Sequence, residues 1–390
     1  MSILSTNSIK ALRETFPFVV IGSGLFGLTM AHLIAEYLGK PVLILEKRDH
    51  IGGNAWSHID PKSNIEVHDY GTHIFHTNNK QVWDFLNQFT KFNNYTHHVW
   101  SNFQNSLYSI PINLSTLNQF FGKVLTPSQA TELIESETKQ YRNRKLENFE
   151  DAALAAIGLN LYNAFIEGYT AKQWQTDPKK LPIEIFTRLP VRKNLDTRYF
   201  NDVYQGQPID GYFSMINKII DHPLIQIETN FDGLEIINEL SIDQILIYTG
   251  PLDQYFNYIH GRLSWRTLDF KFENLDVDDF QGAAVINFPD RSFPYTRIHE
   301  FHHLNPERAK ISGKTIIAKE FSRFSEGNDE PFYPVNAIDD RQALKLYRKK
   351  ATELKNVIFG GRLGTYQYLD MHMAIASAIS VFNNQISLRN

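Results

Sequence analysis

Three glycines near the start of the chain have the spacing of a dinucleotide-binding loop. Gly22, Gly24 and Gly27 fit the pattern G-x-G-x-x-G and directly follow the apolar run 18–21. In such a loop the first glycine allows a tight turn, the second lets the backbone approach a pyrophosphate, and the third lets a helix pack on a strand. The pyrophosphate then lies at the helix N-terminus, where N–H groups and the helix dipole favour an anion.

An acid and a second glycine pair follow at the distance that such a site requires. Glu46 comes directly after the apolar run 41–45, where a carboxylate would bond the hydroxyls of an adenosine ribose and disfavour a 2′-phosphate. Gly52, Gly53 and Asn54 come next. This context favours a flavin-type dinucleotide site over an ordinary glycine turn.

A strand–helix–strand unit must hold these residues in place. The runs 18–21 and 41–45 predict buried strands, and 28–38 predicts the helix between them. Two further short apolar runs, 245–248 and 357–359, each lead into glycine, as strands do at the carboxyl edge of a parallel sheet where a ligand lies. The predicted fold is therefore α/β, with a discontinuous Rossmann-like FAD-binding domain. Its three segments are residues 17–80, 210–260 and 350–385.

Two further domains are expected in the intervening chain. Residues 81–190 show the spaced apolar positions of helices and predict an inserted helical domain, within which the family resemblance given below implies a mobile lid near Trp174. Residues 191–209 and 261–349 mix strand-like runs with loops and predict an antiparallel β-sheet substrate domain. The predicted helices cover 80–89, 128–141 and 152–167, and the clearest predicted strands cover 283–288 and 314–320.

Composition narrows the classes of partner. The chain has 390 residues, a formal net charge of −4 and no cysteine. It therefore has no basic field for nucleic acid, and it has no disulfide, thiolate nucleophile or cysteine-ligated metal, which suits a reducing cytoplasm. No apolar run reaches the ~18 residues of a membrane span, and residues 1–16 lack the apolar core of a signal peptide. We expect a cytoplasmic protein without a nucleic-acid partner or a membrane span.

The C-terminal region predicts a helix that faces the flavin ring. The helix is expected over 371–382, with Asp370 as its N-cap, shortly after Gly360-Gly361-Arg362. The positive end of such a helix can face the N1/C2 carbonyl edge of an isoalloxazine and stabilise an anionic reduced flavin. The alternative is a terminal helix that serves packing alone.

Several polar and aromatic residues carry further chemistry. His73 and His76, three residues apart, resemble a metal pair, but without cysteine or an H-E-x-x-H motif we predict no metal and prefer packing beside the flavin. Trp174 lies in a polar, proline-ended stretch, which favours a mobile loop over a core position. Pro190 separates Arg188 from Arg192, so both arginines are expected on irregular backbone, as candidates for a diphosphate.

The chain resembles the bacterial UDP-galactopyranose mutase family from about residue 17 to 385. The motifs that carry the resemblance are E-K-R at 46–48 with I-G-G-N-A at 51–55, G-T-H-I-F-H at 71–76, G-Y-T at 168–170 with Q-W at 173–174, Y-T-R-I at 295–298, and F-G-G-R-L at 359–363. The resemblance implies an isomerase that binds FAD and interconverts UDP-galactopyranose and UDP-galactofuranose. The flavin must be reduced, forms an N5–sugar adduct, and undergoes no net redox change.

The resemblance also assigns roles to individual residues. It implies that Arg188, Arg297 and His76 are catalytic, the two arginines holding the diphosphate and stabilising the leaving UDP. The implied cofactor-binding residues are Gly22, Gly24, Phe26, Gly27, Glu46, Lys47, Gly53, Asn54, His73, Ile74, Arg362, Tyr368, Asp370 and Met371. The implied substrate-binding residues are His97, Phe165, Tyr169, Thr170, Trp174, Arg188, Tyr199, Asn287, Arg297, Tyr333 and Tyr368. No side chain is an obvious general base, which suits a nucleophile that belongs to the cofactor.

Two positions depart from the family pattern, and other functions compete. His97 stands where the family commonly has asparagine, and Gln175 stands where glycine is common. The family also implies a homodimer. It implies NAD(P)H or another reductant for the flavin. A UDP sugar with an N-acetylated galactose is an alternative substrate. The main competing function is an FAD-dependent, amine oxidase-like oxidoreductase. It would share the glycine loop and Glu46 but need neither the arginines nor the lid. A non-catalytic nucleotide-sugar binder is the third possibility.

Overall fold

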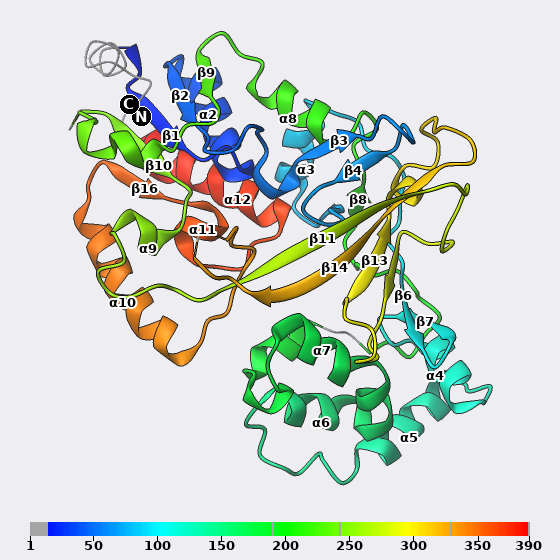
Figure 1. Cartoon of the computed structure of the whole chain (residues 1–390). Helices are drawn as coiled ribbons and strands as arrows, with labels where there is room; N and C mark the ends of the chain where they lie inside the picture. The colour runs from blue at the N-terminus through cyan, green and yellow to red at the C-terminus, as the bar shows by residue number, and fades with distance from the viewer. Residues whose placement is uncertain (1–14, 189–190, 242, 328, 389–390) are drawn as a thin grey trace.

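The computed structural model describes residues 15–188, 191–241, 243–327 and 329–388. Two β-sheets organise this part of the chain, with most helices gathered around them (Figure 1). The first is a five-stranded sheet of order β16-β10-β1-β2-β9, in which every pair is parallel. Its strands are β1 (Phe18–Ile21), β2 (Val42–Leu45), β9 (Ile225–Glu228), β10 (Ile245–Tyr248) and β16 (Val357–Phe359).

Both faces of this sheet are covered, which explains why its strands are apolar runs. Alternate residues such as Val20 and Ile44 face a core that includes α2 (Leu25–Leu38) and α12 (Met371–Val381). The intervening residues, such as Leu43, face the segment η5 (Gly233–Glu239). The predicted α/β fold with a Rossmann-like parallel sheet is confirmed.

The second sheet has seven strands in the order β15-β11-β14-β13-β12-β6-β7. Its strands are β6 (Val99–Phe103), β7 (Ser106–Ile110), β11 (Trp265–Leu275), β12 (Val285–Asn287), β13 (Arg297–Glu300), β14 (Thr315–Phe324) and β15 (Tyr333–Pro334). All neighbours are antiparallel except β6 and β12, so the sheet is mixed rather than purely antiparallel as expected. Two small sheets pair β3 (Ser57–Ile59) with β4 (Glu66–His68) and β5 (Phe75–Thr77) with β8 (Tyr204–Gly206).

The hairpin β6–β7 corrects the helical interpretation of the chain after residue 81. Its two-residue turn, Gln104-Asn105, has φ values of 50° and 58°. Two successive positive φ angles produce the turn that best matches the twist of a hairpin. This hairpin belongs to the seven-stranded sheet, and only the chain beyond it forms the helical cluster.

The helical cluster lies below the second sheet in Figure 1 and has its own apolar core. It contains α4 (Leu114–Phe121), α5 (Pro127–Thr138), α6 (Phe149–Leu161), η2 (Tyr162–Ile166) and α7 (Glu167–Trp174). The other helices are α3 (Lys80–Leu86), α8 (Tyr212–Ile220), α9 (Leu252–Tyr255), α10 (Ile338–Glu353) and α11 (Gly361–Thr365). Short turns are η1 (Gly53–Ala55), η3 (Pro178–Lys180), η4 (Ile183–Arg188), η6 (Phe301–Leu304) and η7 (Phe382–Ile386). Within the described residues, no helix combines the length and apolar character needed to cross a bilayer.

Candidate active site

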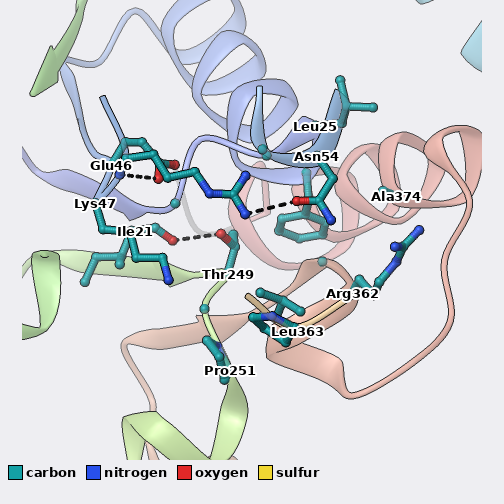
Figure 2. Close-up of a pocket in the computed structure, with 18 of the residues that line it drawn as sticks. Ile21, Leu25, Glu46, Lys47, Asn54, Thr249, Pro251, Arg362, Leu363 and Ala374 are labelled. Carbon is teal, nitrogen blue, oxygen red and sulfur yellow. Dashed lines mark hydrogen bonds between the residues drawn. The ribbon is translucent and has the colours of Figure 1, made fainter. Parts of the chain in front are cut away.

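A cavity opens at the carboxyl edge of the parallel sheet. It encloses about 1190 Å³, counting the space that opens to solvent. Its walls come from the ends of β1, β2 and β10, from the turn after β16, and from the first turns of α2 and α12. Figure 2 shows Glu46, Asn54, Thr249 and Arg362 around it. Segments far apart in the sequence therefore meet where a ligand of a doubly wound sheet is expected.

Close contacts require glycine at positions 22 and 27 of the loop, whereas Gly24 faces open space. Gly22 has a φ of +97°, and a Cβ there would lie 2.1 Å from Oγ1 of Thr249, whose hydroxyl donates to the carbonyl of Ile21 at 2.8 Å. A Cβ on Gly27 would lie 2.2 Å from the carbonyl oxygen of Gly22, so helix and loop pack closely. A Cβ on Gly24 would meet nothing within 4 Å, and no side chain caps α2 there. The start of α2 is thus open for an anion.

Glu46 is held rigidly at the cavity wall. Its Oε2 accepts hydrogen bonds from the backbone N–H and the hydroxyl of Ser23 at 2.8 and 2.7 Å. Its Oε1 accepts from the backbone N–H of Arg48 at 3.0 Å. The residue is only 5% exposed. These bonds orient a carboxylate whose remaining lone pairs can accept from ribose hydroxyls.

Arg48 provides the test of whether an anionic cofactor fits. Its Nη2 donates to Glu330 at 2.7 Å and to Asn54 at 3.0 Å, and its guanidinium carbon lies 4.5 Å from the ring centre of Tyr70. Its Nη1 is buried and has no partner within the described chain. Because a buried donor without an acceptor is costly, this nitrogen fits a ligand oxygen in the cavity that Arg48 lines.

Arg362 fixes the turn that leads into α12. Its guanidinium donates to the carbonyl of Leu369 at 2.6 and 3.2 Å and to that of Phe332 at 3.1 Å. It lies 5.3 and 5.4 Å from the ring centres of Tyr333 and Tyr368, which stack on each other. Asp370 occupies the N-cap position as predicted, but its side chain makes no capping bond.

Most predicted cofactor residues line this cavity. Those that do are Gly22, Gly24, Phe26, Glu46, Lys47, Gly53, Asn54, His73, Arg362, Asp370 and Met371. Ile74 packs instead in the apolar cluster of the second sheet. Burial, followed by the neighbouring His68, lowers the pKa of His73 to about 3, so this histidine is neutral beside the cavity.

A row of polar residues crosses the second sheet. Asn287 on β12, Arg297 on β13 and Glu320 on β14 are register partners, so their side chains share one face. Arg297 Nε lies 3.4 Å from Oε1 of Glu320, and its Nη2 donates to the hydroxyl of Tyr169. The amide oxygen of Asn287 is buried without a partner in the described chain. The row places a cation and an unpartnered amide oxygen side by side.

Glu320 is the buried anion that fixes this row. Burial opposes its charge, but Arg297 and His299 lower its pKa to about 2. His299 lies 3.1 Å from Glu320 through Nε2 and 2.7 Å from the hydroxyl of Thr72 through Nδ1. Glu320 in turn raises the pKa of Arg297, although burial works against it. The guanidinium is therefore permanently charged and oriented.

Helix α7, which we call the lid helix, is latched to the loop 288–295 of this sheet. The ammonium of Lys172 donates to the backbone carbonyls of Phe288, Asp290, Phe293 and Tyr295 at 2.5, 2.7, 3.0 and 3.0 Å. Burial lowers the pKa of Lys172 to about 8. A Cβ on Gly168 would lie 2.3 Å from the carbonyl oxygen of Pro289. This close approach brings Tyr169 to Arg297.

The other predicted substrate residues on the lid side differ in position. Phe165 is buried in the helical core against the rings of Tyr108 and Phe120, and Thr170 is also buried. Trp174 is the last residue of α7 rather than a loop residue. Gln175 ends the helix in the left-handed conformation, with φ of +46°. Glycine adopts this conformation without steric cost, which accounts for the glycine common at this position in the family.

A second group of predicted residues gathers beside β5 and β6. His97 is buried, its carbonyl accepts from the backbone N–H of Tyr199 at 2.7 Å, and burial lowers its pKa to about 3. His76 pairs through Nδ1 with Asp202 at 2.5 Å and stacks on Phe200 at 3.6 Å. Its catalytic role stays a prediction.

Of the two arginines near Pro190, only one has a side chain within the described part of the chain. Arg188 closes η4, but its side chain lies outside the described part of the chain, as does Pro190. Arg192 is buried and donates to the carbonyls of Asp196 and Arg198 and to the side chain of Asn201. Arg192 thus holds its own loop together, and its role as a diphosphate ligand stays a prediction.

Sequence reasoning assigned no site role to Arg48, Lys172 or Glu320. The available signal for Glu320 was an acid at the end of the apolar run 315–318. Lys172 bonds only to backbone, and the partner of Arg48, Glu330, lies 282 residues away. Neither relation leaves a local pattern.

Comparisons with known proteins identify the family of the chain. Residues 164–368 match the family model "UDP-galactopyranose mutase", and residues 20–89 match "NAD(P)-binding Rossmann-like domain". A "Probable UDP-galactopyranose mutase" of Klebsiella pneumoniae is 41% identical over 95% of this chain and 94% of its own. A "dTDP-fucopyranose mutase" of Escherichia coli is 39% identical over 93% of this chain and 96% of its own.

A solved structure bears on the fold alone. The "Crystal structure of reduced UDP-Galactopyranose mutase" covers 95% of both chains with a TM-score of 0.72 at 15% identity. The family model spans more than half of the chain, and two relatives above 30% identity span nearly all of it. The chain therefore belongs to the UDP-galactopyranose mutase family of nucleotide-sugar pyranose–furanose mutases.

Proposed function

We propose that this chain is a UDP-galactopyranose mutase that uses reduced FAD to interconvert UDP-galactopyranose and UDP-galactofuranose. The observation that carries the proposal is the row Asn287–Arg297–Glu320. It sets a permanently charged guanidinium and an unpartnered amide oxygen next to the tyrosine of the lid helix. The guanidinium suits a nucleotide diphosphate that leaves and returns during the reaction, and the amide oxygen can accept from a sugar hydroxyl.

The cavity at the parallel sheet fits FAD. The open start of α2 and the unpartnered Nη1 of Arg48 would hold the pyrophosphate, and Glu46 would hold the ribose. The N-terminus of α12, where Met371 lies and where the side chain of Asp370 makes no capping bond, would face the flavin ring. When bound and reduced, the flavin supplies the nucleophile for the anomeric carbon of the sugar.

The chain's own residues then bind and orient the substrate. Arg297 stabilises the negative charge that develops on UDP as the glycosidic bond breaks, and Glu320 prevents it from turning away. Tyr169 and Trp174 on the lid helix would cover the uridine and hold it in place. Tyr199, Tyr333 and Arg188 are assigned to the phosphates by family resemblance.

A second substrate, dTDP-fucopyranose, is favoured by the relative named for it, whose 39% identity is close to the 41% of the UDP-galactopyranose relative. Fucose lacks the 6-hydroxyl of galactose, and the two nucleotides differ in the base methyl and the ribose 2′-hydroxyl. The two functions therefore share one ring rearrangement and differ only in these substituents of the sugar and the nucleotide.

A direct comparison tests the proposal. The purified protein is reduced with dithionite and given UDP-galactofuranose or the furanose form of dTDP-fucose, and product is followed by chromatography. We expect conversion only in the reduced sample and a higher kcat/KM for the UDP sugar. A higher kcat/KM for the dTDP sugar assigns the second function. Oxygen consumption with an amine, and no sugar conversion, would overturn both.

Three further properties remain predictions of the family resemblance. We propose a homodimer, a cytoplasmic location and NAD(P)H as the reductant of the flavin. Analytical ultracentrifugation tests the first, cell fractionation the second, and anaerobic bleaching of the flavin by NADPH the third.

A further inference from the structure

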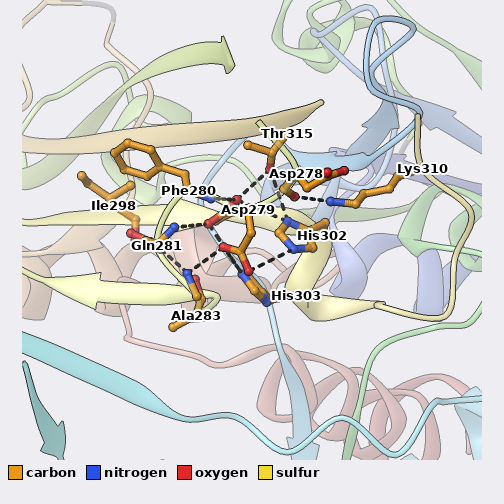
Figure 3. A network of polar contacts seen from close by, with 12 residues as sticks. Asp278, Asp279, Phe280, Gln281, Ala283, Ile298, His302, His303, Lys310 and Thr315 are labelled. Carbon is orange, nitrogen blue, oxygen red and sulfur yellow. Dashed lines mark hydrogen bonds and ion pairs between the residues drawn. The ribbon is translucent and has the colours of Figure 1, made fainter. Parts of the chain in front are cut away.

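A compact polar cluster lies away from both parts of the active site. It joins the end of β13, the turn η6, the start of β14 and the loop 276–284 (Figure 3). Glu300 lies three residues after Arg297 on β13, so its side chain projects from the opposite face of the sheet. The cluster is therefore separate from the substrate row.

Four side chains of this cluster offer metal-ligand atoms to one point. They are Asp279, Glu300, His302 and His303, and one ligand atom from each lies within 4.8 Å of the others. His303 Nε2 lies 3.2 Å from Asp279 and 3.6 Å from Glu300, and His302 Nε2 lies 3.9 Å from Asp279. A tetrahedral shell with bonds of about 2.1 Å separates its donor atoms by about 3.4 Å, so the four are already near that spacing.

The surroundings orient these ligands. The hydroxyl of Thr315 donates to Oε1 of Glu300 at 2.8 Å and lies 3.2 Å from Nδ1 of His302. Because that hydroxyl donates its single proton to Glu300, it can only accept a hydrogen bond from His302. The ring proton of His302 therefore lies on Nδ1. The lone pair of His302 is then on Nε2, the atom that faces Asp279. Backbone N–H groups of Phe280 and Gln281 fix the carboxylate of Glu300 at 2.8 and 2.9 Å.

Burial and ring packing bring the four side chains together at a position that a cation can reach. Glu300 is fully buried, whereas the side chain of Asp279 is 44% exposed and provides an entry path. The rings of His302 and His303 have centres only 3.9 Å apart. Both rings therefore lie within reach of one cation held between the two carboxylates.

We propose that Asp279, Glu300, His302 and His303 bind one divalent transition-metal cation such as Zn²⁺. Two imidazoles and two carboxylates are a donor set that such ions accept. The bound ion would tie the loop 276–284 to the end of β13 and to the turn η6. It would not take part in the sugar chemistry, because the cluster faces away from Arg297.

Zinc content of the full-length, untagged protein tests this site. Protein is stripped with a chelator, incubated with ZnCl₂ and desalted, and the metal is counted by mass spectrometry. We expect about one Zn²⁺ per chain. His303→Gln keeps a polar side chain but should weaken the zinc affinity at least ~100-fold by calorimetry, because even outer-shell changes cost 10–100-fold. Asp279→Asn, at a more exposed position, should weaken it in the same direction.

A matched control separates this cluster from a second group, His76, Asp370 and His372, beside the proposed flavin cavity. His372→Asn should keep the zinc. Thermal unfolding should shift upward with zinc in the wild type but not in His303→Gln, each protein being compared with its own metal-free midpoint. Wild-type protein that emerges without zinc, or zinc retained by His303→Gln and lost by His372→Asn, would overturn the proposal.

Discussion

The latch of the lid helix makes a sharp prediction for Lys172→Met. Methionine keeps the length of the side chain but removes the ammonium, which donates to four backbone carbonyls of the loop 288–295. At pH 7 the amine is still protonated, because its pKa is about 8. The substitution therefore removes donors from a loop whose carbonyls have been arranged around them.

The size of the effect follows from the bonds. An ammonium has three N–H groups, and water can replace part of what is lost because one of the contacts is exposed. Taking about 1 kcal/mol for each of three bonds gives about 3 kcal/mol in favour of the open lid. Since 1.4 kcal/mol is a factor of ten, the open population should rise about a hundredfold. A nucleotide that binds only the closed form would lose affinity by up to the same factor.

Hydrogen exchange measures this without any ligand. Peptides covering 167–174 and 288–295 should exchange up to about a hundredfold faster in Lys172→Met, while peptides of the parallel sheet should not change. Lys179→Met is the matched control, because Lys179 is 65% exposed and its nearest carboxylate is 3.8 Å away. Wild-type exchange of the lid helix in Lys172→Met would refute the latch.

Three other perturbations test the rest of the site. Arg297→Ala should leave flavin bound, because Arg297 does not line the flavin cavity, but should lower kcat by about 10²-fold or more in the furanose assay. Trp174→Ala should weaken UDP binding by calorimetry without shifting the flavin absorption spectrum; a shifted spectrum with unchanged affinity would remove Trp174 from the lid. Burial lowers the pKa of His68, His73 and His97 to about 3. The unfolded chain therefore binds more protons between about pH 6.5 and 3, and the free energy of unfolding should fall as the pH drops through that range. Urea titrations at several pH values give the slope of the free energy of unfolding against pH. In His97→Asn this slope should be smaller by the contribution of about one proton.

The nucleotide-binding half of the site was predictable because its constraints are local. Gly22 adopts a φ of +97°, a Cβ on Gly27 would lie 2.2 Å from the carbonyl oxygen of Gly22, and short apolar strands are required by a sheet covered on both faces. The spacing of these residues therefore carries the geometry directly. Glu46 followed from the same unit, because a strand end and an acid occur together in the sequence.

The substrate half depends on relations that the sequence does not display. Arg297 meets Glu320 because β13 and β14 pair in one register, and a shift by one residue would separate them. Lys172 bonds to backbone oxygens. Because every residue has one, no sequence pattern marks these partners. Trp174 was misplaced because its polar neighbours concealed a helix that ends only at Gln175. The zinc cluster was missed because Asp279 lies 21 residues before Glu300 and joins it only through the loop.

The order of strands in the parallel sheet has a consequence for folding while the chain is being synthesised. The edge strand β16 pairs with β10, and the first turn of α12 forms one wall of the cavity. A growing chain thus carries the glycine loop from its earliest stage but has nowhere to seat a dinucleotide until residues beyond 371 leave the ribosome. We therefore expect flavin capture to be a late event, and the apolar edge of the incomplete sheet to be exposed until then.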